Sequence, residues 1–219
     1  MTHPALIFAQ ACASTYADGA VPAFQDDVRT VHVFTSKING LTCFAFEGTN
    51  TFWEWLIDFM AFKIPFKHAD YGPVHLGLMR DVMAVKQKIV AFLDAEGNPP
   101  YCVAGHSKGA GEAILLHAEM KSMGYAPMQT WAFEPPRVGT HILRDYLAGE
   151  PIGWTATRNS HGRDLVTLVP NDDPLIPLPD ILLPWREIGG GMELIVPDDD
   201  DLAAKHRIPA ILTALAALP

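Results

Sequence analysis

One pentapeptide has the residue types and the spacing of a nucleophile: Gly105-His106-Ser107-Lys108-Gly109. The apolar run Tyr101–Ala104 precedes it, and a helical pattern follows it directly. In a nucleophile elbow, a serine occupies such a strand–helix turn in a strained backbone conformation, with its Oγ presented to substrate. The flanking glycines lack the Cβ atoms that would block the close approach of strand and helix. The helix N-terminus directs N–H groups at the same point, which suits an oxyanion.

The G-x-S-x-G pattern alone is weak evidence, because glycine is common enough for the pattern to arise by chance. Its context strengthens the interpretation. Pro99-Pro100 ends the preceding segment, the expected strand is apolar, and the helix after the turn is long. A Gly-Ser turn without a catalytic role in an α/β fold is the alternative.

A catalytic serine also needs a base within hydrogen-bonding reach. On an elbow of this kind, the acid and then the histidine follow the serine along the chain. His206 is the last histidine and is expected at the start of the final helix. His161 competes with it but precedes the best acid, and His106 is interpreted as a packed neighbour that points elsewhere. We therefore predict His206 as the base.

The acid that orients this base should follow a later strand. Asp164 follows the expected strand Trp154–Arg158 within a few residues, and it is the best candidate. Asp172 and Asp173, in a proline-rich segment, are the alternatives. The run Asp198–Asp201 is too close in sequence to His206 to be its usual partner. We interpret that run as the solvated start of a helix, where negative charge is favoured.

The elements around these residues alternate between strand and helix patterns. This alternation predicts an α/β protein with a mostly parallel central sheet and helices on both faces, folded as a single domain over residues 1–219. Beyond the elbow strand, strands are expected at 30–36, 41–46, 129–133 and 154–158, with two short ones in 185–196, and helices at 6–16, 52–66, 74–93, 108–123, 141–147 and 202–218.

Composition excludes several functions. The chain has 219 residues, 49% of them hydrophobic, and a formal net charge of −9, which argues against binding nucleic acid or anionic lipid. No apolar run is long enough to span a bilayer. The first residues lack the positive start of a Sec signal peptide, so we expect a cytoplasmic protein or one exported by another route. Three cysteines without metal-ligand spacing predict neither a disulfide framework nor a metal site.

Two segments are unusually apolar. Phe52–Phe66 is apolar on several helical faces, with Trp53, Trp55 and Phe62 among its aromatic residues. Such a helix is either buried or meets something apolar outside the protein. It is therefore a core helix or a lid that contacts a lipid interface transiently. The proline-rich segment Pro170–Pro184 either walls an acyl groove or packs on the core. The candidate substrate-binding residues are His75, Trp53, Trp55, Leu175 and Ile176.

Separated motifs lie in one order along the chain: Glu47-Gly48-Thr49, Val74-His75-Leu76-Gly77-Leu78, Gly105-His106-Ser107-Lys108-Gly109-Ala110, Phe133-Glu134-Pro135-Pro136-Arg137-Val138-Gly139, Asp164-Leu165-Val166 and finally His206. In these motifs the chain resembles the class 3 (fungal-type) lipases of the α/β-hydrolase fold, from about Leu6 to Leu215. The resemblance implies that Ser107 is the nucleophile, Asp164 the acid and His206 the base. It also implies that the backbone N–H groups of Thr49 and Lys108 form the oxyanion hole, and it favours a lid at 52–66.

Three positions depart from the family's pattern. Glu47 stands where arginine is usual, Lys108 stands where an apolar residue is usual, and Pro135-Pro136 stiffens a loop that normally starts with glycine. The chain is also shorter than typical fungal members and lacks their disulfides. The lid and the acyl groove are therefore expected to differ from those of the family, and the resemblance does not fix the preferred acyl chain length.

The sequence thus predicts a serine carboxylic-ester hydrolase that cleaves acylglycerols or other fatty-acyl esters through an acyl-enzyme, with no metal or cofactor. One alternative is a phospholipase or a polyester (cutinase-type) hydrolase. Another, from a different class, is a non-catalytic binding protein with a hydrolase fold. A peptidase is a third, which no motif specifically supports.

Overall fold

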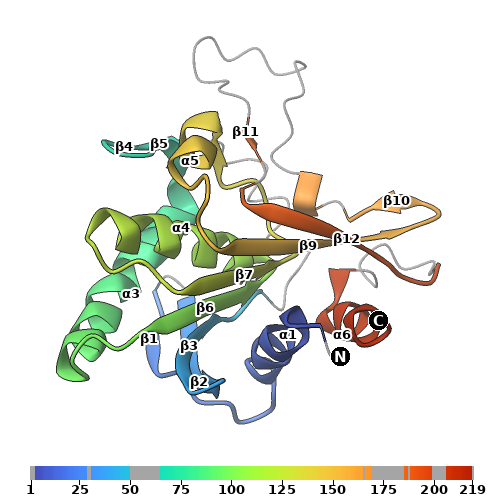
Figure 1. Cartoon of the computed structure of the whole chain (residues 1–219), viewed down its shortest axis with the longest axis horizontal. Coiled ribbons are helices and arrows are strands. Elements are labelled where there is room, and N and C mark those ends of the chain that lie inside the picture. The colour runs from blue at the N-terminus through green and yellow to red at the C-terminus, as the bar shows by residue number, and fades with distance from the viewer. Residues whose placement is uncertain are drawn as a thin grey trace.

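A mixed sheet forms the centre of the computed structural model (Figure 1), which describes residues 3–28, 31–49, 65–164, 166–168, 185–186, 188–198 and 206–218. The sheet has eight strands, in the order β1-β2-β3-β6-β7-β9-β10, with β12 also paired to β9. The bounds are β1 Phe24–Asp26, β2 Val31–Ile38, β3 Leu41–Phe46, β6 Tyr101–His106, β7 Gln129–Phe133, β9 Ile152–Asn159, β10 Gly162–Arg163 and β12 Gly190–Ile195. Strands β3, β6, β7, β9 and β12 run parallel. The mostly parallel sheet predicted from the sequence is confirmed.

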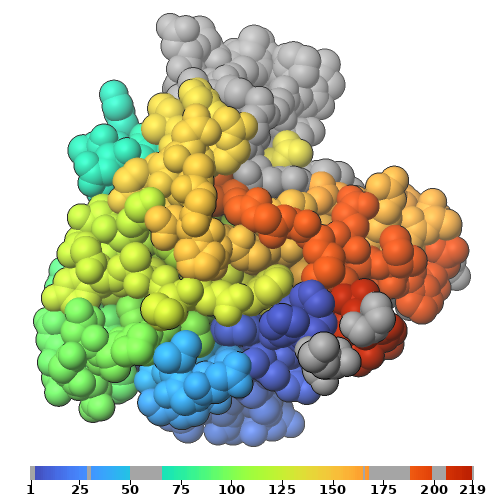
Figure 2. All heavy atoms as spheres, viewed as in Figure 1, coloured from blue at the N-terminus to red at the C-terminus, as the bar shows by residue number. Residues whose placement is uncertain are grey.

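Two pairs of helices cover the two faces of this sheet. Helices α3 (Leu76–Ala95) and α4 (Lys108–Ser122) pack on one face, and α1 (Ala5–Ser14) and α6 (Ile208–Ala216) pack on the other. Figure 2 shows the blue N-terminal region and the dark red C-terminal region meeting at the surface, so the two ends of the described chain lie close together. None of the described helices is long and apolar enough to cross a membrane.

Strand β6 shows why the sheet needs cover on both faces. All six of its residues are buried. Because side chains alternate along a strand, Tyr101 and Val103 join the core under α3 and α4, while Cys102 and Ala104 join the core under α1 and α6. An apolar run without alternation is the expected pattern of a strand buried on both faces, and this run leads directly into the elbow.

A second, four-stranded sheet has the order β11-β8-β5-β4. Its strands are β4 (Pro65–His68), β5 (Gly72–His75), β8 (Gly139–Thr140) and β11 (Trp185–Arg186). This sheet corrects two expectations. The helix expected from Val74 begins at Leu76, and Pro65 and Phe66, expected at the end of a helix, lie in β4. The rest of the expected helix at 52–66 lies outside the described residues.

Several predicted elements are confirmed with small shifts. The β2–β3 hairpin turns at Asn39-Gly40, where both φ angles are positive, as Asn-Gly turns require. Helix α5 (His141–Tyr146) and a short 3-10 turn at Val166–Leu168 complete the described helical segments. The last α-helix begins at Ile208, later than expected, with a proline in its first turn.

Candidate active site

The strand–turn–helix around Ser107 has the geometry of a nucleophile elbow. Ser107 precedes α4 with φ 59° and ψ −125°, a conformation that costs a non-glycine residue about 1–3 kcal/mol. The close approach of strand and helix requires the glycines: a Cβ on Gly105 would lie 2.0 Å from the Gly109 carbonyl oxygen, and one on Gly109 would lie 2.5 Å from the Phe46 carbonyl oxygen. Ser107 Oγ is buried and has no hydrogen-bond partner among the described residues.

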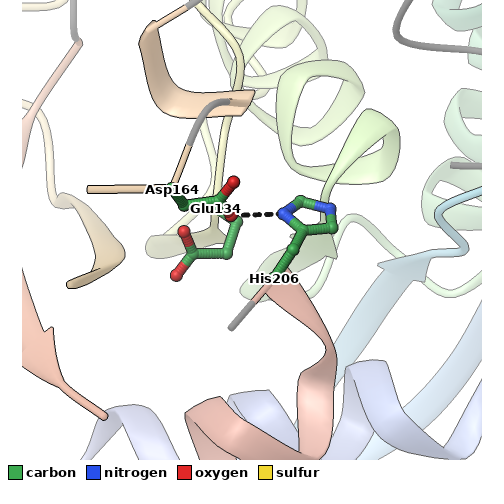
Figure 3. Close-up of side chains that lie close together, drawn as sticks. All are labelled: Glu134, Asp164 and His206. Atoms are coloured by element: carbon green, nitrogen blue, oxygen red, sulfur yellow. Dashed lines mark hydrogen bonds and ion pairs between the residues drawn. The ribbon is translucent and has the colours of Figure 1, made fainter. Parts of the chain in front are cut away.

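Asp164 and His206, which are 42 residues apart in sequence, meet in the structure. The Nδ1–H of His206 donates a hydrogen bond to Asp164 Oδ2 (Figure 3), and both side chains are buried. Asp164 Oδ1 accepts from the Val166 backbone N–H at 3.0 Å, and the Thr167 hydroxyl donates to the Asp164 carbonyl oxygen at 2.8 Å. The acid is therefore held from several sides, and it fixes the tautomer of the histidine so that Nε2 is the basic nitrogen.

The electrostatics keep Asp164 ionised. Burial alone would raise the pKa of this carboxyl group, but the His206 ring and the hydrogen bonds that the carboxylate accepts outweigh burial and lower the pKa. An ionised Asp164 can stabilise the imidazolium that forms when His206 accepts a proton.

His106 connects the elbow to His206. Its Nε2 lies 2.7 Å from the backbone carbonyl oxygen of His206. A carbonyl can only accept, so Nε2 carries the hydrogen and Nδ1 accepts from the Tyr16 hydroxyl at 2.8 Å. Burial and the neighbouring His206 ring lower the pKa of His106 to about 3, which keeps the ring neutral. His106 is a packed neighbour of the serine, as predicted, but it also ties the backbone of His206 to β6, a role that the sequence did not reveal.

The two residues expected to supply the oxyanion hole lie on segments next to Ser107. Lys108 is the first residue of α4, where N–H groups lack intrahelical acceptors. Thr49 follows the carboxyl end of β3, which pairs with β6 so that Phe46 lies opposite Gly105. A Cβ placed on the intervening Gly48 would come within 3.2 Å of Ser107 Cβ. The loop that carries Thr49 therefore passes directly beside the nucleophile.

The Lys108 side chain belongs to a buried ion cluster. Its Nζ lies 3.0 Å from Asp81 Oδ2 on α3 and 2.9 Å from Glu112 Oε1 one turn along α4. Burial raises the pKa of Glu112 to about 8, although Lys108 acts in the opposite direction. The unusual lysine of the elbow thus links two helices through its side chain and leaves only its backbone N–H as a candidate for catalysis.

We predict that Lys108→Met destabilises the protein by about 3 kcal/mol, because it leaves Asp81 buried without its cation. Ester hydrolysis per folded molecule should change by no more than a few-fold, since the backbone N–H remains. Denaturant unfolding and initial rates measure the two effects, with the exposed Lys88→Met as the matched control. An unchanged unfolding midpoint would show that the ion cluster contributes nothing, and inactivity in a stable variant would assign the side chain a catalytic role.

The alternatives to the acid and base lie elsewhere or outside the described residues. His161 is exposed in the turn between β9 and β10. Asp198 Oδ1 accepts from the Ser160 backbone N–H at 2.8 Å, and the rest of the acidic run lies outside the described residues. Asp172 and Asp173 lie outside the described residues.

The candidate substrate-binding residues fall into two groups. His75 is buried and caps α3, with its Nδ1 accepting from the Leu78 backbone N–H. This gives it a structural role, and its contact with substrate stays a prediction. The other candidates, namely Trp53, Trp55, Leu175 and Ile176, lie outside the described residues. Glu47, which replaces the family's arginine, pairs with His32 across 2.7 Å.

Glu134 also lies in the site, although its sequence motif assigns it no role. Oxygen and nitrogen atoms of Glu134, Asp164 and His206 lie within 4.8 Å of one another, and Figure 3 shows both carboxyl groups on one side of the imidazole ring. The three residues have metal-ligand chemistry, and the Nδ1 of His206 is hydrogen-bonded to Asp164. The sequence feature that could have identified Glu134 is an acidic residue at the carboxyl end of a buried parallel strand.

Comparison with known proteins gives a family and a fold. Residues 43–173, more than half of the chain, match the family model described as Lipase (class 3). The sequence matches no curated protein.

Several solved structures share the fold at low identity. The Rhizomucor miehei triacylglyceride lipase is 16% identical with a TM-score of 0.64, over 89% of this chain and 78% of that chain. A triacylglycerol lipase whose catalytic centre is formed by a serine protease triad is 16% identical with a TM-score of 0.67, over 88% and 79%. The mono- and diacylglycerol lipase of Aspergillus oryzae is 17% identical with a TM-score of 0.64, over 90% and 80%. The α/β-hydrolase fold expected from the sequence is therefore confirmed.

Proposed function

The chain belongs to the class 3 lipase family, and we propose that it is a serine carboxylic-ester hydrolase that cleaves acylglycerols or other fatty-acyl esters. The observation that carries the proposal is the buried hydrogen bond between Asp164 and His206. It joins a later strand to the C-terminal region, and His106 ties His206 to the elbow that presents Ser107. Nucleophile, acid and base follow one another along the chain in the order expected for this fold.

In the proposed reaction, Ser107 Oγ attacks the ester carbonyl carbon while His206 Nε2 takes the hydroxyl proton. The carbonyl oxygen becomes an oxyanion, which accepts hydrogen bonds from the backbone N–H groups of Thr49 and Lys108. Losing one such donor typically costs about 3–4 kcal/mol of transition-state stabilisation. His206 then gives the proton to the departing alkoxide, which leaves an acyl group on Ser107. Water, activated by the same histidine, hydrolyses this ester and restores the serine.

The substrate class follows from the family and from composition. The structurally similar lipases act on tri-, di- or monoacylglycerols. In this chain the apolar segments at 52–66 and 170–184 supply candidate surfaces for acyl chains. We propose that the first, up to residue 64, acts as a lid and that the second walls the acyl groove, within a single domain.

A substrate panel tests this proposal. We expect the protein to hydrolyse acylglycerols and soluble p-nitrophenyl esters several-fold faster than phospholipids or an aliphatic polyester, because selectivity follows differential transition-state binding. Rates should be measured at matched ester concentration, with Ser107→Ala as the blank. Faster release of acid from phospholipid or polyester would assign the protein to that class of hydrolase. Binding of lipid without turnover of any ester would make it a non-catalytic binding protein.

A further inference from the structure

Glu134 follows β7 in a conformation that suits glycine. Its φ is 54°, which is unfavourable for residues with a Cβ and costs glycine nothing. Its side chain is fully buried, and burial of a carboxyl group is costly unless the group is hydrogen-bonded. The family's pattern has glycine at this place in the motif. Glu134 therefore combines a strained backbone conformation with a buried carboxyl group. The surroundings of this carboxyl group indicate its role.

The carboxyl group of Glu134 has two kinds of neighbour. Its Oε1 accepts from the Thr157 backbone N–H at 2.8 Å, and the Glu134 backbone N–H donates to the Thr155 carbonyl oxygen at 3.0 Å, so β9 fixes the residue twice. Its Oε2 accepts from no N–H or O–H of the described residues. The nearest acid is Asp164, and a carboxyl oxygen of Glu134 lies within 4.8 Å of one of Asp164.

The close approach of these two buried acids requires a proton. Adjacent buried carboxylates cannot both be ionised, because the like charges are not screened by water. Asp164 receives hydrogen bonds from the His206 ring and from the Val166 N–H, whereas Glu134 receives one backbone N–H. The charge therefore resides on Asp164 and the proton on Glu134.

The charged groups near Glu134 agree with this assignment. Burial and the charge of Asp164 raise the pKa of Glu134 well above its usual value, and Arg163 acts in the opposite direction. Arg163 itself pairs with Glu193 across 3.3 Å, which weakens its lowering effect on the pKa of Glu134. His206 lies on the far side of Asp164 and stabilises the charge there.

We propose that Glu134 is a positioning residue, a neutral carboxylic acid that donates a hydrogen bond to Asp164 and holds it against the Nδ1–H of His206. The role rests on the proposed function of Ser107 and His206. The Val166 N–H donates to one oxygen of the Asp164 carboxylate, and Glu134 lies beside this carboxylate. Together they keep the carboxylate from rotating away from the His206 ring. Glu134, Asp164 and His206 thus form one group, in which Glu134 carries a proton in addition to the proton on His206 Nδ1.

Two variants of Glu134 and one control test the proposal. Glu134→Gly removes the carboxyl group and relieves the backbone strain. It should lower kcat by about tenfold or more with KM within a factor of about two, because a misoriented acid gives the wrong histidine tautomer. Glu134→Gln keeps a donor for Asp164 and an acceptor for the Thr157 N–H, and should recover most of this loss. Asn98→Gly, at an exposed residue that also has a positive φ, should leave kcat unchanged.

A measurement independent of turnover follows the proton itself. At neutral pH the parent should show an infrared C=O stretching band of a protonated carboxylic acid that is missing from Glu134→Gln. Because Glu134 keeps its proton when folded and loses it when unfolded, the parent should also lose unfolding free energy relative to Glu134→Gln as the pH rises from about 5 to 8.

The outcomes separate this proposal from the proposed function. An active parent with unchanged kcat in Glu134→Gly, or with no recovery in Glu134→Gln, would overturn the positioning role. The absence of the infrared difference would do the same. A parent that shows this band but hydrolyses no ester would overturn the proposed function and the positioning role together, while the carboxyl pair itself would stand.

Discussion

Ser107→Ala should lower kcat for ester hydrolysis by roughly 10⁴- to 10⁶-fold, because the nucleophile and its base act as a unit. The substitution removes one oxygen atom that has no hydrogen-bond partner among the described residues. Alanine has a Cβ atom like serine and therefore similar restrictions on its backbone angles, so the elbow should keep its conformation. Initial rates on a soluble short-chain ester, measured together with the melting temperature, test this expectation.

The serine at the other end of α4 provides the control. Ser122 closes α4, where its hydroxyl donates to the Glu119 carbonyl oxygen. Ser122→Ala should therefore keep the parent rate. Turnover of Ser107→Ala within about tenfold of the parent would rule out Ser107 as the nucleophile, whatever the melting temperature.

His206→Ala and Asp164→Asn should be the next most damaging substitutions. Without His206 no group takes the serine proton, and we expect a loss similar to that of Ser107→Ala. Asp164→Asn leaves the shape of the site but no longer favours the productive histidine tautomer, for which about 10⁴-fold is typical. Both variants should stay folded, as circular dichroism and the melting temperature would show.

The competing residues serve as controls for these two variants. His161 is exposed in the β9–β10 turn, and Asp198 accepts a hydrogen bond from the backbone of that turn. His161→Ala and Asp198→Asn should therefore keep nearly full activity. An inactive His161→Ala beside an active His206→Ala would show that chain order had selected the wrong base.

The parts of the fold that the sequence predicts well are those set by local pattern. The uninterrupted apolar run of β6, the glycines at 105 and 109 and the long helix after them determine the elbow within eleven residues. The Asn39-Gly40 hairpin is equally local. Chain order then singles out Asp164 and His206 as candidates, and the structure brings these two together.

Other features depend on partners that are distant in sequence. Strand β8 has two residues and pairs with β5, more than sixty positions earlier, so periodicity carries no signal for the second sheet. Lys108 meets Asp81 on another helix, which no spacing rule predicts. Glu134 has its hydrogen-bond partner on β9 and lies beside Asp164, and the proton that we propose for it depends on the fold burying both acids.

The most direct test of the proposed function is covalent labelling with a fluorophosphonate, which phosphonylates a serine activated by a neighbouring base, followed by mass-spectrometric mapping of the modified residue. We predict one adduct per chain, on Ser107, absent from Ser107→Ala, formed far more slowly in His206→Ala, and unchanged in His161→Ala. An unlabelled parent protein, or an adduct on another residue, would contradict the assignment of Ser107 as an activated nucleophile.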